Sequence, residues 1–512
     1  MNTANFKKET AVISIFCLFA VCRTFPTPAD RDRLMKLEWF ESTGGNLLST
    51  KKELQVNDLL KKVKIKEIAD GMETGKFPPA MHFFRAKELI EKSTVFNIIR
   101  KMPKGAGLHL HEYALLSVDW LVKNATYLPN CYICFTPVGG IKFYYFLRNP
   151  QKRFAKCSEW VLLEKYRQQI QNVTEFDNSL LRNLTLATEN PEEAYQSQNK
   201  IWEKFEEKFV AARSLISYAP VFKSYFYEAL REFYHDNVQY IEIRAMLLPV
   251  YELNGVFHDK EWSIMAYQEV ARQFSRDNPD FMGAKVIFSV QRKVNNSEMR
   301  TAINKAMELY KKFPETMAGF DMIGQEDVGH PLWYFKNELL IPAEMGVKLP
   351  YFFHAGETDW EGMSIDENIL DALLLNTSRI GHGYSINKHP LAKQISKQFD
   401  VPFEVCPISN QVLMLVTDLR NHPATVLMAE GHPMVISADD PAVFGARGLS
   451  YDFYEAFMGV GGSKAELTTL KQLALSSIKY SAMSVQMKIE TDKLWQKKWD
   501  EFLDEVLNMQ QG

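Results

Sequence analysis

The chain has 512 residues, of which 46% are hydrophobic and 24% are charged, and its formal net charge is −3. This is an ordinary globular composition with ample apolar material for a core. Nothing in this nearly balanced charge points to a polyanionic partner such as nucleic acid, although a local basic patch is compatible with it. The length exceeds one minimal domain, although α/β barrels alone often exceed about 250 residues.

The first residues have the pattern of a secretory signal. Lys7 and Lys8 precede the apolar run 11–22 (AVISIFCLFAVC), which is shorter than the roughly 20 residues that cross a bilayer. The basic start and the small residues near its end predict a signal peptide over residues 1–23, with an uncleaved anchor as the alternative. No other stretch is long and apolar enough for a transmembrane segment. We therefore expect a secreted, extracellular protein, or one delivered to lysosomes.

Two further features fit secretion. Acceptor triplets for N-glycosylation occur at Asn124, Asn172, Asn183, Asn295 and Asn376. Beyond the signal, the cysteines are Cys131, Cys134, Cys157 and Cys406. In an oxidising compartment, a disulfide from Cys131 or Cys134 to Cys157 fits this spacing. The CxxC pair also matches half of a zinc site, but no second pair lies near it. Cys406 lies in an apolar strand pattern, which predicts a buried free thiol.

Residues from about 30 to 101 repeat apolar side chains at helical spacing, as in LQVNDLLKKVKIKEIADGM. This pattern predicts a helical segment over residues 24–101. Such helices need a partner surface, which is either the rest of the chain or a second subunit.

A different pattern begins at residue 107. Eight short apolar runs follow, most of them separated by helical stretches: 107–111, 240–245, 285–290, 318–324, 349–357, 379–383, 401–407 and 433–440. Strands that alternate with helices predict a parallel sheet with right-handed crossovers. Eight such units favour a closed (β/α)8 barrel over an open doubly wound sheet.

The connection between the first two runs is much longer than the roughly 30 to 40 residues of a β/α unit. It contains three of the acceptor asparagines and three of the cysteines. We therefore predict an inserted small domain over residues 124–185, held by a disulfide. The barrel would then comprise residues 102–123 and 186–512.

Polar residues stand where these runs end, which is where (β/α)8 barrels carry their reacting groups. His109 and His111 are two residues apart on a strand, so both imidazoles face the same side. Together with His354 and Asp439 they form a set of nitrogen and oxygen ligands that suits one Zn²⁺ with a position left for water. The alternative is a group of hydrogen-bonded core histidines.

Three further residues complete the predicted chemistry. Glu357 follows His354 by three residues and can shuttle protons to the group under attack. His382, flanked by glycines, has room to orient a water whose pKa the metal lowers toward about 7. Asp440 faces away from its neighbour Asp439 and can bind substrate. The H-x-E and P-C-x-x-C motifs of cytidine-type zinc deaminases do not occur, which excludes that class.

These residues lie in longer segments that resemble the secreted adenosine deaminase-related growth factor family. The resemblance runs from about Phe77 almost to the end and is carried by MPKGAGLHLHE, YIEIRA, LPYFFHAGETDW, RIGHG, FEVCPISNQVL and ADDPAVFGARGLSYDFYE. It implies a barrel of the metal-dependent hydrolase type and the zinc-dependent hydrolysis of adenosine and 2′-deoxyadenosine to inosine, 2′-deoxyinosine and ammonia.

The resemblance also implies roles for individual residues. Zinc would be held by His109, His111, His354 and Asp439. Glu357 would donate a proton to purine N1, and His382 would assist the attacking hydroxide. Purine and ribose contacts would come from Asp440 at N7, the Gly324 backbone at N3, and Trp202 and Glu206 around the sugar. The helical segment would form a homodimer interface, and the insertion would bind a cell-surface receptor or glycosaminoglycan.

The chain departs from the family pattern at three positions. Glu112 stands where Asp is usual, and Gln325 where His is usual. The third strand ends in Val290-Gln291-Arg292, where an Asp-His-Arg run is usual. Glu112 and Gln291 fall at positions that contact the nucleoside in the family, so they bear on affinity more than on the reaction. Two alternatives stay open: a related hydrolase of another amino-purine, and a growth-factor-like ligand with weak deaminase activity.

Overall fold

Eight parallel strands form the centre of the molecule. The computed structural model describes residues 27–136, 140–148, 150, 157 and 159–509, so the predicted signal peptide lies outside the described residues. One four-stranded sheet has the order β1 (Gly105–His111), β5 (Val238–Ala245), β8 (Gly283–Gln291), β9 (Met317–Ile323). The other has the order β10 (His354–Ala355), β11 (Ile380–His382), β12 (Phe403–Val405), β13 (Met434–Ile436).

Two isolated parallel bridges join these sheets into a closed barrel. Phe320 of β9 pairs with Tyr351, just before β10, and Leu110 of β1 pairs with Asp439, just after β13. At the second seam, Asp439 N donates to His109 O at 3.0 Å and His111 N donates to Asp439 O at 3.2 Å. The (β/α)8 prediction is confirmed, and the open-sheet alternative is wrong.

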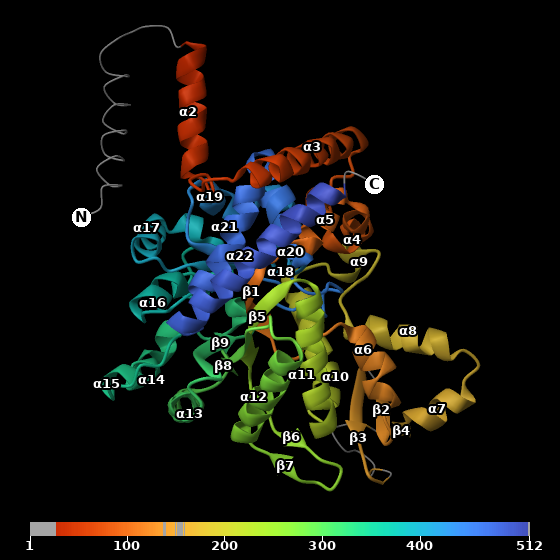
Figure 1. Ribbon diagram of the computed structural model, residues 1–512. Helices are drawn as coiled ribbons and strands as arrows, with labels where there is room; N and C mark the ends of the chain where they lie inside the picture. The colour runs from red at the N-terminus through yellow and green to blue at the C-terminus, as the bar shows by residue number, and fades with distance from the viewer. Residues whose placement is uncertain (1–26, 137–139, 149, 151–156, 158, 510–512) are drawn as a thin grey trace.

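Helices cover the outside of the barrel (Figure 1). They include α11 (Ala219–His235), α12 (Lys260–Asp277), α13 (Asn296–Lys312), α16 (Asn368–Leu374), α17 (Pro390–Gln398), α19 (Ala424–Ala429) and α21 (Leu467–Tyr480). Helix α13 shows why such segments fold this way. Asn295 and Glu298 form a capping box at its start, and the buried residues Met299, Ile303 and Ala306 recur at helical spacing. Contacts join α12 to β8, α13 to β9 and α21 to both β1 and β13.

The N-terminal region is helical, as predicted. It contains α2 (Pro28–Glu41), α3 (Lys51–Thr74), α4 (Phe83–Lys92) and α5 (Thr94–Lys101). Helix α3 packs on α21 and on α22 (Val485–Asn508). Glu53 anchors this contact, because it accepts from Lys471 Nζ at 2.6 Å and from Trp499 Nε1 at 2.9 Å.

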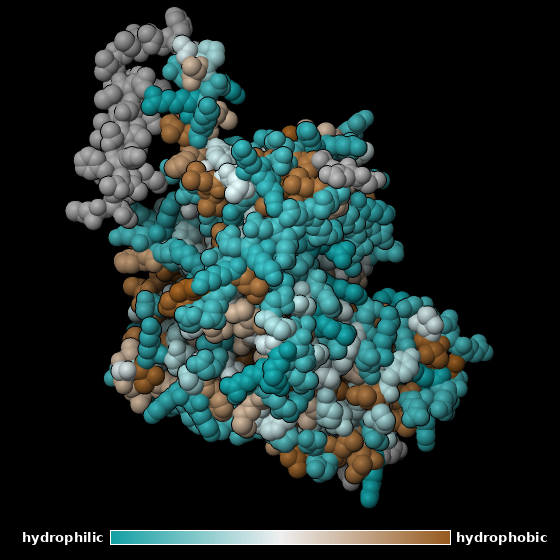
Figure 2. All heavy atoms as spheres, in the orientation of Figure 1, coloured by the Kyte–Doolittle hydropathy of each residue, from teal (hydrophilic) through white to brown (hydrophobic). Residues whose placement is uncertain are grey.

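Helix α2 differs from the other N-terminal helices because it projects from the body (Figure 1). All 14 of its residues are exposed or half-buried. Its exposed side chains include the apolar Leu34, Met35 and Phe40. Brown apolar surface along this helix and at its base is visible in Figure 2. The helix therefore presents apolar surface that no other segment of residues 27–136, 140–148 or 159–509 covers.

The long connection after β1 forms a small antiparallel sheet with helices beside it. It contains α6 (Val118–Lys123), the antiparallel sheet β3 (Ile141–Tyr145), β2 (Cys131–Phe135), β4 (Val161–Leu162), and the helices α7 (Leu163–Gln169) and α8 (Val173–Leu184). Strand β3 packs against α10 (Gln198–Ile216), the helix that leads back to the barrel.

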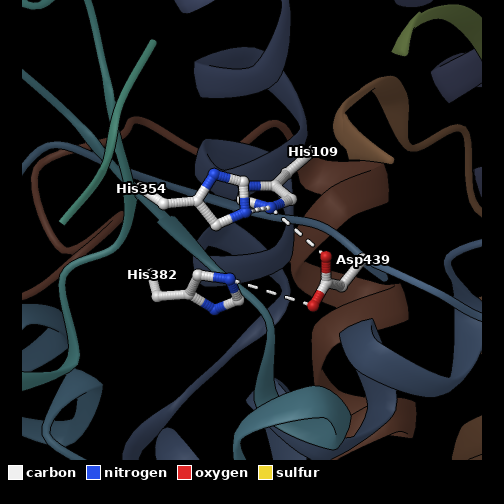
Figure 3. A group of neighbouring side chains, drawn as sticks. All are labelled: His109, His354, His382 and Asp439. Atoms are coloured by element: carbon white, nitrogen blue, oxygen red, sulfur yellow. Dashed lines mark hydrogen bonds and ion pairs between the residues drawn. The ribbon is translucent and has the colours of Figure 1, made fainter. Parts of the chain in front are cut away.

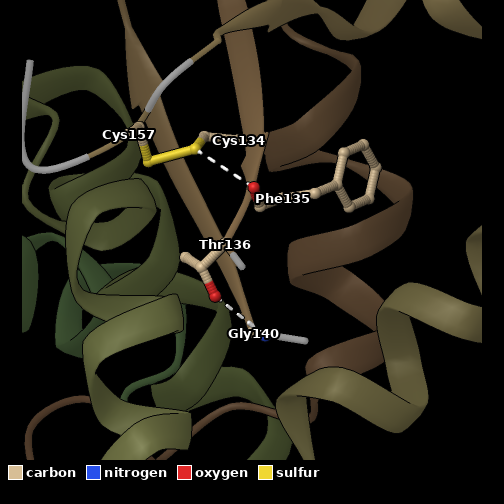
Figure 4. The surroundings of a disulfide bond; sticks show 5 residues. All are labelled: Cys134, Phe135, Thr136, Gly140 and Cys157. Carbon is tan, nitrogen blue, oxygen red and sulfur yellow. Dashed lines mark hydrogen bonds between the residues drawn. A yellow bond between two sulfur atoms is a disulfide. The ribbon is translucent and has the colours of Figure 1, made fainter. Parts of the chain in front are cut away.

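A disulfide joins Cys134 of β2 to Cys157 (Figure 4). Cys131 and Cys406 are buried free thiols. Of the two cysteines in the CxxC pair, Cys134 thus forms the disulfide with Cys157. Cys406 is a buried free thiol, as predicted.

The predicted glycosylation sites differ in their exposure. Four of the acceptor asparagines are exposed, and the fifth, Asn183, is half-buried with its amide donating to Ser179 O at 2.9 Å. Among the residues that the structure describes, no helix combines the length and the apolar character that a membrane crossing requires.

Candidate active site

The barrel brings the predicted metal-binding side chains together at the carboxyl ends of its strands. His109 and His111 come from β1, His354 from β10, and Asp439 from the turn after β13. His109 Nε2 lies 3.0 Å from His354 Nε2 and 3.3 Å from Asp439 Oδ1. His111 Nε2 lies 2.9 Å from the same carboxylate oxygen. Figure 3 shows His382, from the end of β11, beside this group.

Two of the histidines are oriented by carboxylates behind them. His109 Nδ1 lies 2.7 Å from Glu404 Oε2, and His354 Nδ1 lies 2.7 Å from Asp321 Oδ2. A carboxylate at Nδ1 holds the ring proton there and leaves the Nε2 lone pair free, which is the usual arrangement of a metal-ligating histidine. The two free Nε2 atoms point at each other and at Asp439.

Asp439 provides the second test of whether a metal fits. Its Oδ2 accepts from Ser409 Oγ at 2.7 Å. Its buried Oδ1 makes no hydrogen bond with any residue of the described chain, although two imidazole nitrogens lie close to it. A buried, unpaired carboxylate oxygen is costly unless a cation or donor satisfies it. The nitrogen and oxygen set therefore fits a metal ion bound by these residues.

A second layer of buried charges lies beneath the histidines. Arg244 of β5 donates to Asp321 Oδ2 at 2.8 Å and to Glu404 Oε2 at 2.5 Å. Arg379, just before β11, also donates to Glu404, and to Glu242 of β5 at 2.6 Å. Burial alone would raise the pKa of Glu404, but the guanidinium groups of Arg244 and Arg379 hold it well below its usual range.

None of these buried charged residues is among the site residues predicted from the sequence. A signal was present, because a charged residue interrupts each apolar run concerned, as in YIEIRA, AGFDMIG and FEVCP. Charges that face a barrel interior need buried partners, and here Arg244 of β5 reaches across the interior to Asp321 of β9 and Glu404 of β12, which are not on strands next to β5.

Glu357 lies on the loop after β10, beside the group of histidines and Asp439. Glu326, another residue that the sequence analysis did not identify, accepts from the backbone N of Gly356 at 3.0 Å and of Glu357 at 2.7 Å. Glu357 Oε1 lies 3.5 Å from His382 Nε2 and has no hydrogen-bond partner in the described part of the chain. Burial, followed by the nearby Asp439 charge, raises the pKa of Glu357 well above its usual value. This carboxyl group can therefore hold a proton near neutral pH.

The backbone is unusual at two of these residues. His382 has φ 58° and Asp439 has φ 59°, in the left-handed region that non-glycine residues rarely adopt. Such conformations collect at functional sites, where the surrounding structure enforces them. Gly381 has a related role, because a Cβ there would lie 3.0 Å from His109 Cε1 and 3.1 Å from His354 Cα. The glycine lets the histidines approach one another.

A cavity of about 340 Å³ opens over the cluster. Its lining includes every residue that the resemblance assigns to the substrate: Glu112, Trp202, Glu206, Gln291, Gly324 and Asp440. Trp202 and Glu206 belong to α10. Gln291 is the last residue of β8, and Glu112, Gly324 and Asp440 lie after the ends of β1, β9 and β13. The structure thus gathers these six residues around one space next to the histidines.

Two of the departures from the family pattern are explained by their contacts. Glu112 accepts from Tyr267 OH at 2.8 Å and from Met246 N at 3.0 Å, so both carboxylate oxygens are engaged by the cavity wall. Gln325 does not line the cavity and donates to Asn199 Oδ1 at 3.0 Å. Glu112 therefore supports the wall, and Gln325 joins the loop after β9 to α10.

Gly324 and Gln291 form the floor of the cavity next to each other. Gly324 has φ +95°, and a Cβ there would lie 2.4 Å from Gln291 Oε1. Only glycine permits both this backbone conformation and this close contact.

Comparisons with known proteins agree with this geometry. The adenosine deaminase family profile matches residues 177–494, and the adenosine/AMP deaminase N-terminal profile matches residues 28–99. Adenosine deaminase 2 of Pongo abelii is 56% identical over 496 residues, covering 96% of this chain and 97% of that protein.

Solved structures share the fold at low identity. Arabidopsis ADAL in complex with GMP has a TM-score of 0.56 at 18% identity and covers 78% of this chain and 98% of that chain. An amidohydrolase from Burkholderia ambifaria with bound Zn has a TM-score of 0.51 at 18% identity and covers 81% and 95%. These two show the barrel fold, and the sequence matches show the family. The chain belongs to the adenosine deaminase family, in its adenosine deaminase 2-like branch.

Proposed function

We propose that the protein is a secreted, zinc-dependent adenosine deaminase that hydrolyses adenosine and 2′-deoxyadenosine to inosine, 2′-deoxyinosine and ammonia. The main support is that one cavity brings together a candidate metal site and a candidate proton donor. The metal site consists of two histidines that carboxylates orient and of the unpaired Asp439 Oδ1, and the proton donor is Glu357. Family membership supplies the class of substrate.

His109, His111, His354 and Asp439 would hold the zinc ion. When bound, zinc supplies a water activated for attack near neutral pH. His382 is left out of this set because its Nδ1 faces the Asn410 amide, 3.1 Å away, where His109 and His354 face carboxylates. It stands beside the cluster and contacts the attacking water.

Glu357 acts as the general acid. A protonated Glu357 donates to purine N1, which draws electrons from C6 and prepares that carbon for attack. The support is the raised pKa and the unpaired Oε1, which leave a proton and a free direction in which to donate it. Positioned acids of this kind contribute about 10²–10⁴-fold in rate.

The substrate contacts follow from the cavity lining. Asp440 Oδ1 is buried, lines the cavity and has no hydrogen-bond partner among the described residues, which suits a contact with purine N7. The Gly324 backbone faces N3. Trp202 and Glu206 would hold the ribose together with Gln291, while Glu112 shapes the wall behind it.

Secretion and assembly belong to the same proposal. Helix α2 would pair with a second copy of the chain, because its apolar side chains lack cover within one chain. The insertion around β2, β3 and β4 would contact a cell-surface receptor or glycosaminoglycan, since it stands apart from the cavity and carries exposed acceptor asparagines. The glycosylation sites and the signal peptide support the secretory route.

The test is a deamination assay on purified protein with its metal content measured on the same sample. We expect about one zinc per chain and conversion of adenosine and 2′-deoxyadenosine to the corresponding inosines. A zinc-loaded protein that converts neither nucleoside, but deaminates another amino-purine, would support the related-hydrolase alternative. A zinc-loaded protein without any deaminase activity would support the ligand alternative.

A further inference from the structure

A chain of buried polar groups leads from the back of His382 out to the barrel exterior. Asn410, on α18 (Pro407–Val412), places its Nδ2 3.1 Å from His382 Nδ1. On its other side, Asn410 Oδ1 lies 2.9 Å from His422 Nε2. The backbone N of Ala424 lies 3.0 Å from His422 Nδ1. All three side chains are buried, so water does not compete for these hydrogen bonds.

The direction of every hydrogen bond in this chain is fixed by its outer end. A backbone N–H can only donate, so His422 Nδ1 must accept from Ala424. Burial lowers the pKa of His422 to about 3, so the ring is neutral and its single proton is on Nε2. His422 Nε2 therefore donates to Asn410, which turns the amide oxygen toward His422 and the NH₂ group toward His382.

We propose that this chain fixes His382 as a neutral imidazole with its proton on Nε2, so that His382 donates a hydrogen bond into the site and does not act as a base there. The Asn410 NH₂ group can only donate, so His382 Nδ1 must accept. A proton on His382 Nδ1, in the other neutral tautomer or in the imidazolium, would face a second donor. Asn410 and His422 are positioning residues in this scheme.

The far side of the His382 ring shows where its proton points. His382 Nε2 lies 3.5 Å from Glu357 Oε1 and 3.8 Å from Asp439 Oδ2, on the side where the attacking water stands in the proposed function, on which this inference rests. A hydrogen bond from Nε2 orients the oxygen of that water. Because Nε2 carries a proton, the proton that the water loses must pass to a carboxylate, and Glu357 can take it once it has given its own proton to purine N1.

A direct test is neutron diffraction from crystals of the zinc-loaded protein exchanged into D₂O. We expect deuterium on Nε2 of both His382 and His422, none on Nδ1 of either ring, and the Asn410 ND₂ group facing His382. Deuterium on His382 Nδ1 would overturn the inference. This readout does not depend on turnover, so it separates failure of the inference from failure of the proposed deaminase function.

Variants provide a kinetic test. In Asn410→Asp a carboxylate, which only accepts, replaces the donor and reverses the tautomer of His382. An analogous reversal in a serine protease triad lowers kcat by about 10⁴-fold, and we expect at least a tenfold fall in kcat with KM and zinc content retained. The matched control is Asn387→Asp, a neighbouring half-buried asparagine whose amide donates to Pro423 O at 2.9 Å; its kcat should stay near wild type.

The outer end of the chain is tested separately. His422→Gln keeps a donor toward Asn410 Oδ1, whereas His422→Leu does not, so the Gln variant should have a kcat at least several-fold above that of the Leu variant. Equal kcat in these two variants, or a wild-type kcat in Asn410→Asp, would contradict the positioning role. If Asn410→Asp fails to fold, the neutron map of the wild-type protein still decides the question.

Discussion

The two halves of the barrel are built differently. Strands β1, β5, β8 and β9 have 7, 8, 9 and 7 residues, whereas β10, β11, β12 and β13 have 2, 3, 3 and 3. The short half nevertheless provides His354, Glu357, His382 and Asp439. A strand that leaves the ladder early can turn its next residues into the mouth of the barrel, and two of these residues do so with a left-handed backbone.

The short half compensates for its missing ladder with side-chain contacts. Arg379 and Glu404 lie in the short half, and each bonds to a residue of the long half: Glu242 in one case and Arg244 in the other. The two halves of the barrel therefore have different roles. Apart from the histidines of β1, the long half provides the frame and part of the substrate wall, and the short half carries the chemistry on a backbone that buried charges stabilise.

The largest effect should come from the metal ligands in the short half. His354→Ala or Asp439→Ala should remove both zinc and deaminase activity, because each deletes one of the four proposed ligands. Elemental analysis and the adenosine assay measure the two losses. Ser289→Ala, a buried hydroxyl change within the long strand β8, is the control and should retain both. A His354→Ala protein with full zinc and activity would show that the ligand set is different.

Glu357→Gln should have the next largest effect. Gln fills the same space but cannot transfer the proton, so kcat should fall by about 10²–10⁴-fold while zinc content stays at the wild-type level. Steady-state kinetics with parallel metal analysis check this. Activity above a tenth of wild type would assign proton transfer to another group.

Arg379→Leu tests the charges that join the two halves. It removes the guanidinium that pairs with the buried Glu242 and leaves Glu404 with one guanidinium, that of Arg244, in place of two. Breaking a buried pair in this way typically costs about 3–5 kcal/mol. Denaturant unfolding of the zinc-free protein measures the loss. The control is Arg420→Leu, which removes the partly exposed pair with Asp418 and should cost less than about 1 kcal/mol. Equal losses in the two variants would argue against the role given to the buried network.

The insertion should respond separately from both halves. Replacing Cys134 and Cys157 together by serine opens a loop with a sequence separation of 23, for which chain entropy gives about 3 kcal/mol. We expect faster hydrogen exchange in β2, β3 and β4 with little change in kcat. If kcat falls together with the protection of this sheet from hydrogen exchange, the insertion also determines the position of α10 and the shape of the cavity.

The smallest effect should come from the substrate wall in the long half. Gln291→His, at the end of β8, restores the residue type usual in the family and should lower KM for adenosine by up to about tenfold, the value of one good hydrogen bond. Contacts to the sugar are made about equally in the ground and transition states, so kcat should change less. If Gln291→His changes kcat and leaves KM unchanged, Gln291 contributes to the chemical step and the long half is not limited to substrate binding.

The sequence predicted the strand positions well because each strand is an apolar run with a polar end. The run 349–357 is an instructive exception, since only His354 and Ala355 form a strand there. Pro350 has no N–H to donate, and Tyr351 contributes only an isolated bridge. The proposed metal ligands could be predicted from the sequence for the same reason, because they stand at the ends of the predicted strands.

Other features depend on geometry that a single sequence does not contain. The choice between Cys131 and Cys134 depends on which face of β2 meets Cys157, because residues three apart on a strand point to opposite faces. The positive φ values of His382 and Asp439 are enforced by the surrounding structure and not by residue type. The partners of Glu404 come from strands far apart in the sequence, so its role appears only once those strands enclose the same barrel interior.

Glu404 also has a consequence for how the protein matures. One carboxylate receives His109 from the first strand, Arg244 from the second and Arg379 from the sixth, so His109 acquires its metal-ready orientation only after the first and last thirds of the chain have met. A chain released halfway through assembly would have no competent place for zinc. If these residues hold a metal ion as proposed, a metal-loaded molecule has already completed its barrel.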